Sequence, residues 1–336
     1  MSIRPWGVIL AGGDGTRLRE LSRLVSGDNR PKQFCTLFGN TSLLERTRAR
    51  LAPTIAHDRT IFAVVRDHER FYRSELADVD ESRIVVQPAN RGTAAAIIYS
   101  LVRLERLDHD PLVAFFPADH YFANEEDFAQ NVENAFDEAR RHPELLVLLG
   151  AKPEKAETGY GWIEPGAPME IGGKGSSLTF RVRRFWEKPS APVAEQLLDS
   201  GCLWNTFVIV GRARTFFETI EAAAPRTLKT FRALRNATAK QEEMQRAAEL
   251  YAAMPSGDFS REVLTRCPDR LAVLQMNDVG WGDLGTPAGV VDAIGKTRPA
   301  AGQRDEFNDW LAGYRSQLDR ARLHPAGAQS VARGGH

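Results

Sequence analysis

The sequence predicts an α/β fold with a mixed, mainly parallel central sheet flanked by helices on both faces. As far as about residue 150, apolar runs of strand length alternate with segments of helical period, a pattern typical of repeated βαβ units. Beyond that point strand-like segments follow one another with fewer helices, so the sheet should become mixed. A chain that is 43% hydrophobic and 26% charged is ordinary for a globular protein and can bury a large core.

The first half should contain strands that each lead through a turn into a helix. Ser42 and Glu45 have the spacing of a capping box, which marks the start of the first clear helix. The expected strands are 6–10, 61–65, 83–87, 112–116 and 145–149, and the expected helices are 43–51, 68–77, 93–107 and 127–141.

The second half has a different rhythm. Its expected elements are strands at 160–164, 178–187 and 204–210, a helical stretch over 213–254, a strand at 271–275 and a glycine-rich turn at 278–285. We expect one domain over residues 1–295 and a polar C-terminal segment over 296–336, with an amphipathic helix at 305–323 and a frayed end. The hexapeptide repeat of a β-helix is absent.

Charge and apolar patterning exclude several classes of partner. Lys and Arg together number 44, as do Asp and Glu, so no overall field draws the protein to nucleic acid or to an anionic membrane. No apolar run approaches the length that crosses a bilayer, and the N-terminus reads as a buried strand rather than a signal peptide. We therefore expect a cytoplasmic protein. Cys35, Cys202 and Cys267 are too widely spaced for a metal knuckle and should be reduced and structural.

The segment Gly7–Leu18 carries the strongest chemical signal. A hydrophobic strand ends in Gly12, Gly13 and Gly15, which let backbone N–H groups approach phosphate oxygens, and Thr16 can begin a helix whose N-terminus favours anions. Arg17 adds a permanently charged fork. A dinucleotide fingerprint would need glycine at Leu18, and a Walker A loop would need Gly-Lys-Ser/Thr, so neither fits. An ordinary connection between strand and helix remains the alternative.

The order of short motifs along the chain resembles the sugar-1-phosphate nucleotidyltransferases. Leu-Ala-Gly-Gly-Asp-Gly-Thr-Arg-Leu (10–18) followed by Arg-Pro-Lys-Gln-Phe (30–34) is similar to the opening of that family, and Pro-Lys-Gln-Phe to its mannose-1-phosphate guanylyltransferase (GDP-mannose pyrophosphorylase) branch. The later motifs are Gln-Pro (87–88), Arg-Gly-Thr-Ala (91–94), Phe-Pro-Ala-Asp-His (116–120), Thr-Gly-Tyr-Gly (158–161), Phe-Trp-Glu-Lys-Pro (185–189), Trp-Asn (204–205) and Val-Gly-Trp-Gly-Asp-Leu-Gly-Thr (279–286).

The resemblance implies a Rossmann-like nucleotide-diphospho-sugar transferase fold, in a short form without a β-helix or isomerase domain. It also assigns site residues. Arg17 and Lys32 would be catalytic, and Asp119 and Asp283 would bind Mg²⁺. Nucleotide contacts would come from Leu10, Ala11, Gly12, Gly13, Gly15, Thr16, Gln87, Gly92 and Thr93, and sugar-phosphate contacts from Asp119, Gly161, Glu187, Lys188 and Asn205.

The implied reaction transfers a nucleoside monophosphate from a nucleoside triphosphate, GTP in particular, to a hexose 1-phosphate, mannose 1-phosphate in particular, with release of pyrophosphate. The attacking phosphate is already ionised and needs no general base, so catalysis would rest on alignment and charge neutralisation. An assembly of identical subunits is left open. A non-catalytic regulator that binds sugar nucleotide, and a metal-dependent glycosyltransferase, are the alternatives from other classes.

Several residues also have simpler interpretations. Asp119 could cap a helix, Asp283 could be a turn residue and Lys32 could be a solvated loop charge. Gly161 could belong to an ordinary hairpin and Asn205 to a turn. His120 is expected to orient a loop rather than to act as a catalyst.

The sequence also departs from the family at three places. Arg-Glu-Leu-Ser (19–22) replaces the usual Trp-Pro-Leu-Ser, and Gln87-Pro88 with Arg91-Gly92 replaces Glu-Pro with Arg-Asn. Thr206-Phe207 replaces Ser-Gly and should place a bulky ring near the sugar. The base and the hexose therefore stay open in this interpretation.

Overall fold

The computed structural model describes residues 4–169, 178–235, 240–286, 289–290 and 293. Its strands are β1 Trp6–Leu10, β2 Thr60–Val65, β3 Ile84–Gln87, β4 Leu112–Pro117, β5 His120–Tyr121, β6 Leu146–Ala151, β7 Gly161–Pro168, β8 Thr179–Glu187, β9 Leu203–Arg212, β10 Leu271–Gln275 and β11 Gly282–Asp283. Its α-helices are α1 Arg19–Ser26, α2 Leu43–Leu51, α3 Glu69–Glu75, α4 Gly92–Leu107, α5 Glu125–Arg141, α6 Ala191–Asp199, α7 Ala213–Ala223, α8 Pro225–Arg235 and α9 Lys240–Ala253.

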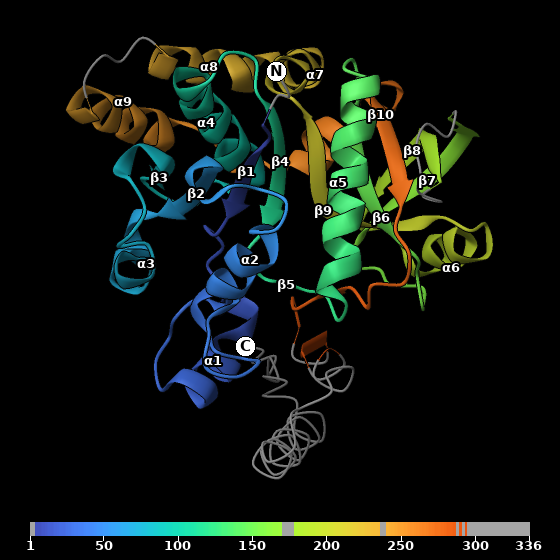
Figure 1. Cartoon of the computed structure of the whole chain (residues 1–336), viewed down its shortest axis with the longest axis horizontal. Coiled ribbons are helices and arrows are strands. Elements are labelled where there is room, and N and C mark those ends of the chain that lie inside the picture. Colours follow the sequence, from blue (N-terminus) through green and yellow to red (C-terminus); the bar gives the residue numbers. More distant parts are fainter. Residues whose placement is uncertain (1–3, 170–177, 236–239, 287–288, 291–292, 294–336) are drawn as a thin grey trace, which may run out of the picture.

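Nine of these strands form one mixed sheet in the order β3-β2-β1-β4-β9-β6-β10-β8-β7 (Figure 1). The ladders between β3, β2, β1 and β4 are parallel, as is the ladder between β6 and β10. β9 is antiparallel to β4 and to β6, and β8 is antiparallel to β10 and to β7. β8 and β9 thus oppose the direction that the other strands share, which confirms a mixed, mainly parallel sheet.

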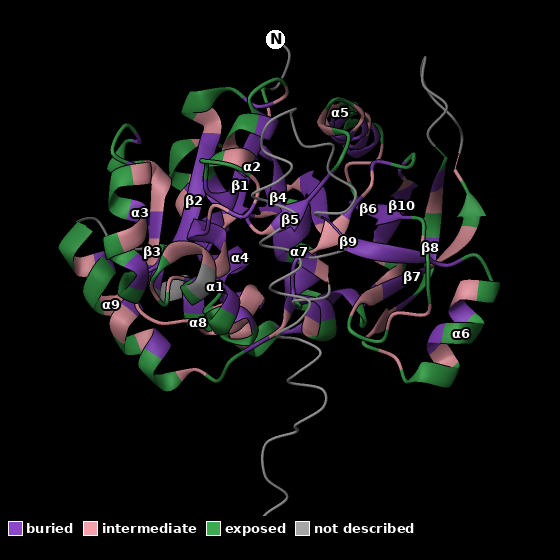
Figure 2. Cartoon of the chain, turned by 90° about the horizontal axis from the view of Figure 1, so that it is seen from below, coloured by how far each residue is buried: buried purple, intermediate pink, exposed green. Residues whose placement is uncertain are grey.

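Alternation of side chains along the buried strands divides the core between the two faces of the sheet. Val8, Ile61 and Phe115 belong to a cluster that α4, α7, α8 and α9 cover, whereas Ile9 and Phe62 belong to a cluster covered by α2, α3, α5 and α6. Successive residues of a strand point to opposite faces, so a strand buried on both faces reads as an unbroken apolar run. Figure 2 shows the buried residues concentrated in the strands between the helices.

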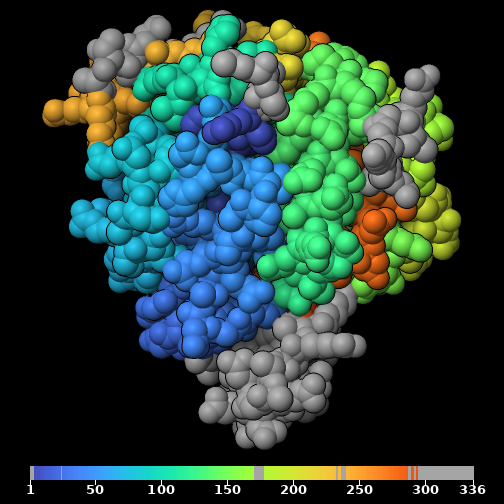
Figure 3. All heavy atoms as spheres, in the orientation of Figure 1, coloured from blue at the N-terminus to red at the C-terminus, as the bar shows by residue number. Residues whose placement is uncertain are grey.

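Local signals in the sequence set the ends of several helices. Ser42 and Glu45 form both hydrogen bonds of the expected capping box at the start of α2. The short 3-10 turn Thr16–Leu18 continues into α1, as expected after the glycine loop. The predicted stretch over 213–254 divides into α7, α8 and α9. α2 contacts α5, and the two lie side by side on the face that Figure 3 shows.

Some expectations concern chemistry or regions beyond these elements. Cys35, Cys202 and Cys267 are free and buried, and burial raises the pKa of each thiol, which fits a structural role. No described helix combines the length and apolar character that crossing a bilayer requires. The expected helix at 305–323 and the tail that contains it lie outside the described residues.

Candidate active site

A pocket of about 520 Å³ opens where β1, β3 and β4 end, at the carboxyl edge of the parallel part of the sheet. Open α/β sheets bind their ligands at this edge. Most of the residues predicted from the sequence line this pocket together: Leu10, Gly12, Gly13, Arg17, Lys32, Gln87, Gly92, Thr93, Asp119, Gly161, Glu187, Lys188, Asn205 and Asp283. These residues come from segments as far apart as 10 and 283, and the fold brings them into one cavity.

Three predicted residues do not line the pocket, and each has a structural position instead. Ala11 is buried, and its N–H donates to the Ala63 carbonyl at 2.8 Å. Gly15 has φ +59, and a Cβ there would lie 3.0 Å from the Lys32 nitrogen, so only glycine fits this bend. Thr16 begins the 3-10 turn. These residues shape the loop, and their contact with a nucleotide stays a prediction.

Gln33, whose role was not predicted from the sequence, holds the glycine loop in place through two hydrogen bonds. Its side chain is buried, and its amide nitrogen donates to the carbonyl oxygens of Ala11 at 2.8 Å and Gly13 at 2.9 Å. With these carbonyls held inward, the loop is free to turn N–H groups toward a ligand. The signal was present, because Gln33 lies within the Pro-Lys-Gln-Phe motif.

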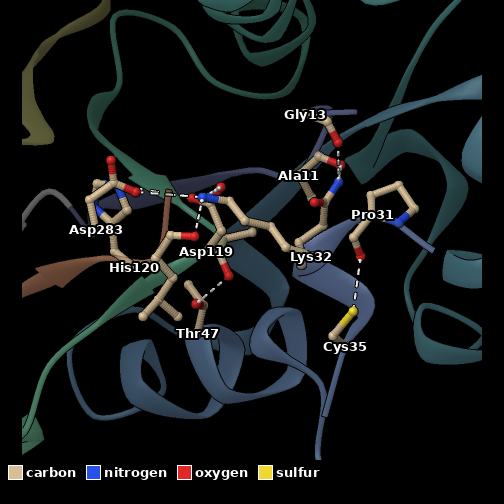
Figure 4. A network of polar contacts seen from close by, with 12 residues as sticks. Ala11, Gly13, Pro31, Lys32, Cys35, Thr47, Asp119, His120 and Asp283 are labelled. Atoms are coloured by element: carbon tan, nitrogen blue, oxygen red, sulfur yellow. Dashed lines mark hydrogen bonds and ion pairs between the residues drawn. The ribbon is translucent and has the colours of Figure 1, made fainter. Parts of the chain in front are cut away.

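Lys32 lies between the two aspartates predicted to bind metal (Figure 4). Its ammonium nitrogen is 2.9 Å from Asp119 Oδ2 and 3.5 Å from Asp283 Oδ1, and it donates to the Leu284 carbonyl at 3.2 Å. The interpretation of Lys32 as a solvated loop charge is therefore wrong. Asp119 does not cap a helix either, because α5 begins after Asn124 and Asn124 accepts the capping hydrogen bond.

A two-stranded ribbon explains why residues 119 and 283 meet. β5 pairs antiparallel with β11, with Asp283 opposite His120 and Gly282 opposite Tyr121. From the other side, the Thr47 hydroxyl donates to the Ala118 carbonyl at 3.2 Å and fixes the turn before Asp119. Asp283 is thus a strand residue rather than a turn residue, and the ribbon holds both carboxylates beside Lys32 in the pocket lining.

The electrostatics of this cluster favour its charged form. Burial acts to lower the pKa of Lys32, but the neighbouring Asp119 and Asp283 outweigh it and the pKa is raised. Burial acts to raise the pKa of Asp119, but Lys32 and then His120 outweigh it, so that pKa is lowered. At neutral pH the Lys32 ammonium and the Asp119 carboxylate are ionised together.

His120 is oriented by a tryptophan. Trp281 Nε1 donates to His120 Nδ1 at 3.3 Å, so the imidazole proton is on Nε2. That nitrogen lies 3.8 Å from Asp283 Oδ1 and 4.0 Å from Asp119 Oδ1, beyond hydrogen-bond distance. Burial lowers the pKa of His120, which therefore stays neutral near pH 7. This arrangement fits the expectation that His120 orders the site rather than transfers a proton.

Arg17 occupies a different kind of position. It is exposed, lines the pocket and has no hydrogen bond or ion pair to any residue in the described part of the chain. A guanidinium in this state can turn toward an anion without first breaking an internal contact.

At one end of the pocket, two predicted nucleotide contacts, Gln87 and Thr93, also bind neighbouring segments, including a loop that the sequence did not predict. Gln87 is buried, accepts from the Tyr251 hydroxyl at 3.2 Å and donates to the Val64 carbonyl at 3.4 Å. Thr93 Oγ1 accepts from the N–H of Phe259 at 2.9 Å. The loop after α9 therefore lies against the N-terminus of α4, where Ser256, Gly257, Asp258 and Ser260 join the pocket lining.

The opposite end combines the remaining predicted residues. β7 and β9 pair near their starts, with Trp162 opposite Trp204, and this places Gly161 beside Asn205. A Cβ on Gly161 would lie 2.9 Å from Phe185 Cζ, 3.2 Å from Glu187 Oε2 and 3.4 Å from Asn205 Cβ. The Lys188 ammonium is 2.5 Å from Glu187 Oε1. A compact polar subsite with hydrogen-bonding groups on its walls results.

The two carboxylates fit a hard divalent cation that takes some of its ligands from the protein and the others from a substrate. Both carboxylates approach the same ammonium, and their side chains remain 23% and 25% exposed toward the pocket. Magnesium is commonly held by one or two carboxylates together with substrate phosphates. Among the described residues, no group of three or more acidic, histidine or cysteine side chains could hold a metal ion alone. Substrate oxygens would therefore have to complete the coordination.

Comparison with known proteins gives consistent matches. The profile of the nucleotidyl transferase family matches residues 6–298. The Xanthan biosynthesis protein XanB of Xanthomonas campestris pv. campestris is 33% identical over 85% of this chain and 58% of its own length. A mannose-1-phosphate guanylyltransferase of Salmonella montevideo is 31% identical over 83% of this chain and 58% of its own length. The chain thus spans somewhat more than half the length of these curated relatives.

A solved structure shares the architecture. The crystal structure described as mannose-1-phosphate geranyltransferase from Thermus thermophilus superposes with a TM-score of 0.71 at 28% identity. The match covers 84% of this chain and 77% of the other.

Substitution of two pocket glycines should have different effects on the stability of the fold. Gly92 has φ +83, and a Cβ there would collide with the Gly257 carbonyl oxygen, whereas a Cβ on Gly13 would meet nothing within 4 Å. We expect Gly92→Ala to lower the free energy of unfolding by about 1–3 kcal/mol. Gly13→Ala should leave it within about 0.5 kcal/mol of the parent. Urea denaturation of both variants checks this, and equal losses would contradict the described geometry.

Proposed function

We propose, because the chain belongs to the nucleotidyl transferase family, that it transfers a nucleoside monophosphate from a nucleoside triphosphate to a hexose 1-phosphate and releases pyrophosphate. The observation that carries this proposal is the position of Lys32 between Asp119 and Asp283, in the same pocket as the glycine loop and the Gly161 subsite. The glycine loop suits a triphosphate at one end. The polar subsite suits a phosphorylated sugar at the other.

The residues support a mechanism based on alignment and charge neutralisation. The sugar phosphate attacks the α-phosphorus as an oxyanion, so no side chain has to remove a proton, and His120 can remain neutral. Negative charge grows on the α-phosphoryl oxygens and on the leaving pyrophosphate. Arg17 and Lys32 can approach these oxygens from the glycine-loop side of the pocket and stabilise the charge as it develops.

We assign Mg²⁺ as the cofactor and the carboxylates of Asp119 and Asp283 as its protein ligands. Bound there, it would supply positive charge next to the phosphates and so reduce repulsion between two anionic substrates. The Lys188 ammonium would form an ion pair with the phosphate of the sugar. Glu187 and Asn205 would form hydrogen bonds with sugar hydroxyls. Gly161 would let the sugar approach the backbone.

We further propose GTP as the donor. Asp258 lines the pocket beside the N-terminus of α4, and its Oδ1 accepts from the N–H of Arg261 at 3.1 Å. Its Oδ2 has no hydrogen bond to any residue that the structure describes and can accept from a ligand. Guanine presents two neighbouring donors, N1–H and N2–H, whereas the corresponding edges of adenine, cytosine and uracil carry acceptors that a carboxylate would repel.

Mannose 1-phosphate is the proposed acceptor, because relatives at 30–33% identity carry the name mannose-1-phosphate guanylyltransferase or belong to xanthan biosynthesis. The product would then be GDP-mannose. We place the reaction in the cytoplasm, where nucleoside triphosphates and sugar phosphates occur together, and a homo-oligomer would be compatible with it.

Pyrophosphate release tests the reaction. The full chain with Mg²⁺ is assayed against four nucleoside triphosphates combined with mannose, glucose and galactose 1-phosphates, and the combination of GTP and mannose 1-phosphate should react fastest. Arg17→Ala should lower kcat by about a hundredfold, because a charge contact made in the transition state is lost. Arg19→Ala, two residues along the chain and outside the pocket, is the matched control. No transfer with any pair would refute the proposal.

A second assay tests the base contact. Inosine triphosphate lacks the N2 amino group, so the parent protein should prefer GTP over it by about tenfold, as expected for one charge-assisted hydrogen bond. Asp258→Asn should reduce this preference to about twofold or less. The kcat/KM values for the two nucleotides give the ratio. A ratio that stays the same in the variant would remove Asp258 from base recognition.

A further inference from the structure

Phe207 has a backbone conformation that an aromatic residue rarely adopts. It lies within β9 with φ +58, in the left-handed region. Among the described residues, Asp110, Lys188 and Phe207 are the non-glycine residues with positive φ. Lys188 and Phe207 both line the pocket. Residues held in strained conformations cluster at functional sites, so these two positions call for a functional explanation.

The bulge that carries Phe207 is stabilised by its neighbours' side chains. The β6–β9 register shifts between Leu148 and Gly150, where β9 has extra residues. Thr206 Oγ1 donates to the Leu149 carbonyl at 2.7 Å, and the N–H of Phe207 donates to Asn205 Oδ1 at 3.1 Å. The strain at Phe207 is therefore imposed by a hydrogen-bonded frame. That frame also occupies the oxygen of the Asn205 amide and leaves its NH₂ group for a ligand.

Glycine would adopt this conformation without strain. The chain does use glycine at other positive-φ positions, including Gly15, Gly92 and Gly280. Phenylalanine at 207 makes the fold less stable than glycine would at this φ. We therefore look for the role of Phe207 in its ring.

Phe207 contributes an apolar side chain to the pocket lining, two residues from Asn205 on β9. Leu10 ends β1, Pro117 ends β4 and Phe207 lies on β9, the next strand of the sheet, so three adjacent strands each contribute an apolar residue to the lining. Leu10 and Phe207 are partly buried against the same core cluster. Phe207 is two residues from Asn205 and separated by β4 from the glycine loop. Phe207 is therefore a partly buried residue of the pocket lining, close in sequence to the predicted sugar contact Asn205.

We propose that Phe207 is a specificity-determining residue, whose ring forms an apolar wall that restricts the acceptor to hexose 1-phosphates without an acetamido substituent. The inference rests on the proposed function and names the acceptor class for it.

The surroundings of Gly161 form a second wall of the pocket and explain why the ring would be restrictive. The space where a Cβ of Gly161 would lie is already bounded by Phe185, Glu187 and Asn205, so this second wall cannot recede. A sugar between the two walls can place C–H groups against the ring and hydroxyls toward Glu187 and Asn205. An acetamido group turned to the ring would lose its water without gaining a hydrogen bond, and such burial is unfavourable.

Three variants of the full chain test the proposal. Phe207→Gly and Phe207→Ala remove the apolar wall, and Phe207→Leu replaces the ring by a shorter apolar side chain that keeps part of the wall. Each is assayed by pyrophosphate release with GTP and Mg²⁺, using mannose 1-phosphate and N-acetylglucosamine 1-phosphate as acceptors. KM is measured for GTP and for both acceptors, and thermal unfolding is followed by circular dichroism.

Removal of the apolar wall should raise the kcat/KM ratio of the N-acetylated acceptor to mannose 1-phosphate by about tenfold or more, as expected when a steric wall is lost. KM for GTP should stay within about twofold, and Phe207→Leu, which keeps part of the wall, should change the ratio less than Phe207→Gly or Phe207→Ala. An unchanged ratio in both Phe207→Gly and Phe207→Ala would overturn the proposal. So would a change in KM for GTP alone, or an equal fall in rate with both acceptors, which indicates a purely structural role.

These outcomes separate the inference from the reaction on which it rests. A parent protein that transfers to hexose 1-phosphates, with variants of unchanged selectivity, refutes only the role of Phe207. A folded parent protein that releases no pyrophosphate with any acceptor refutes the proposed function itself.

Discussion

The contact of one ammonium with two carboxylates is the interaction on which the site depends. Lys32, Asp119 and Asp283 belong to three separate segments, namely the 3-10 turn that follows α1, the turn between β4 and β5, and the short strand β11. In a partly buried setting such charges attract strongly, and removing one partner would leave an uncompensated charge. Two carboxylates with one internal cation also keep a net negative charge, which suits a divalent metal. The same contact therefore joins three segments of the chain at the pocket, at the place where we propose that metal and phosphate bind.

Around this centre the sheet provides a rigid frame, and the ligand contacts come from the segments at its edge. Gln33 holds the glycine loop, Thr93 holds the loop that carries Asp258, and the hydrogen bonds of Asn205 and Thr206 hold Phe207. Each of these side chains acts by fixing backbone next to the pocket, so the binding groups are ordered before a substrate arrives. Such preorganisation lowers the cost of aligning two anions for reaction.

Much of this architecture could be predicted, because strands buried on both faces leave unbroken apolar runs and helices leave a regular period. Runs such as Ile61–Val65 and Leu112–Phe116 therefore identified β2 and β4. β5 and β11 were missed because a two-residue strand has no periodicity, although their pairing brings Asp119 and Asp283 together. The position of Asp258 in the pocket was missed for a similar reason. Its loop is held against α4 by the hydrogen bond from Phe259 to Thr93, and no local sequence pattern indicates a contact between residues so far apart. Gly15 and Thr16 were placed in the right segment; their part in shaping the loop is visible in the structure, and their contact with a nucleotide stays a prediction.

The most direct test of this account is the dependence of GTP binding on Mg²⁺, measured by titration calorimetry without an acceptor. If the two carboxylates share a metal with the triphosphate, Mg²⁺ should tighten GTP binding to the parent protein by about tenfold or more, or about 1.4 kcal/mol. The double variant Asp119→Asn with Asp283→Asn should lose that increment while still binding GTP through the glycine loop. Binding that is equally tight with Mg²⁺ or with a chelator in the parent protein would contradict the account.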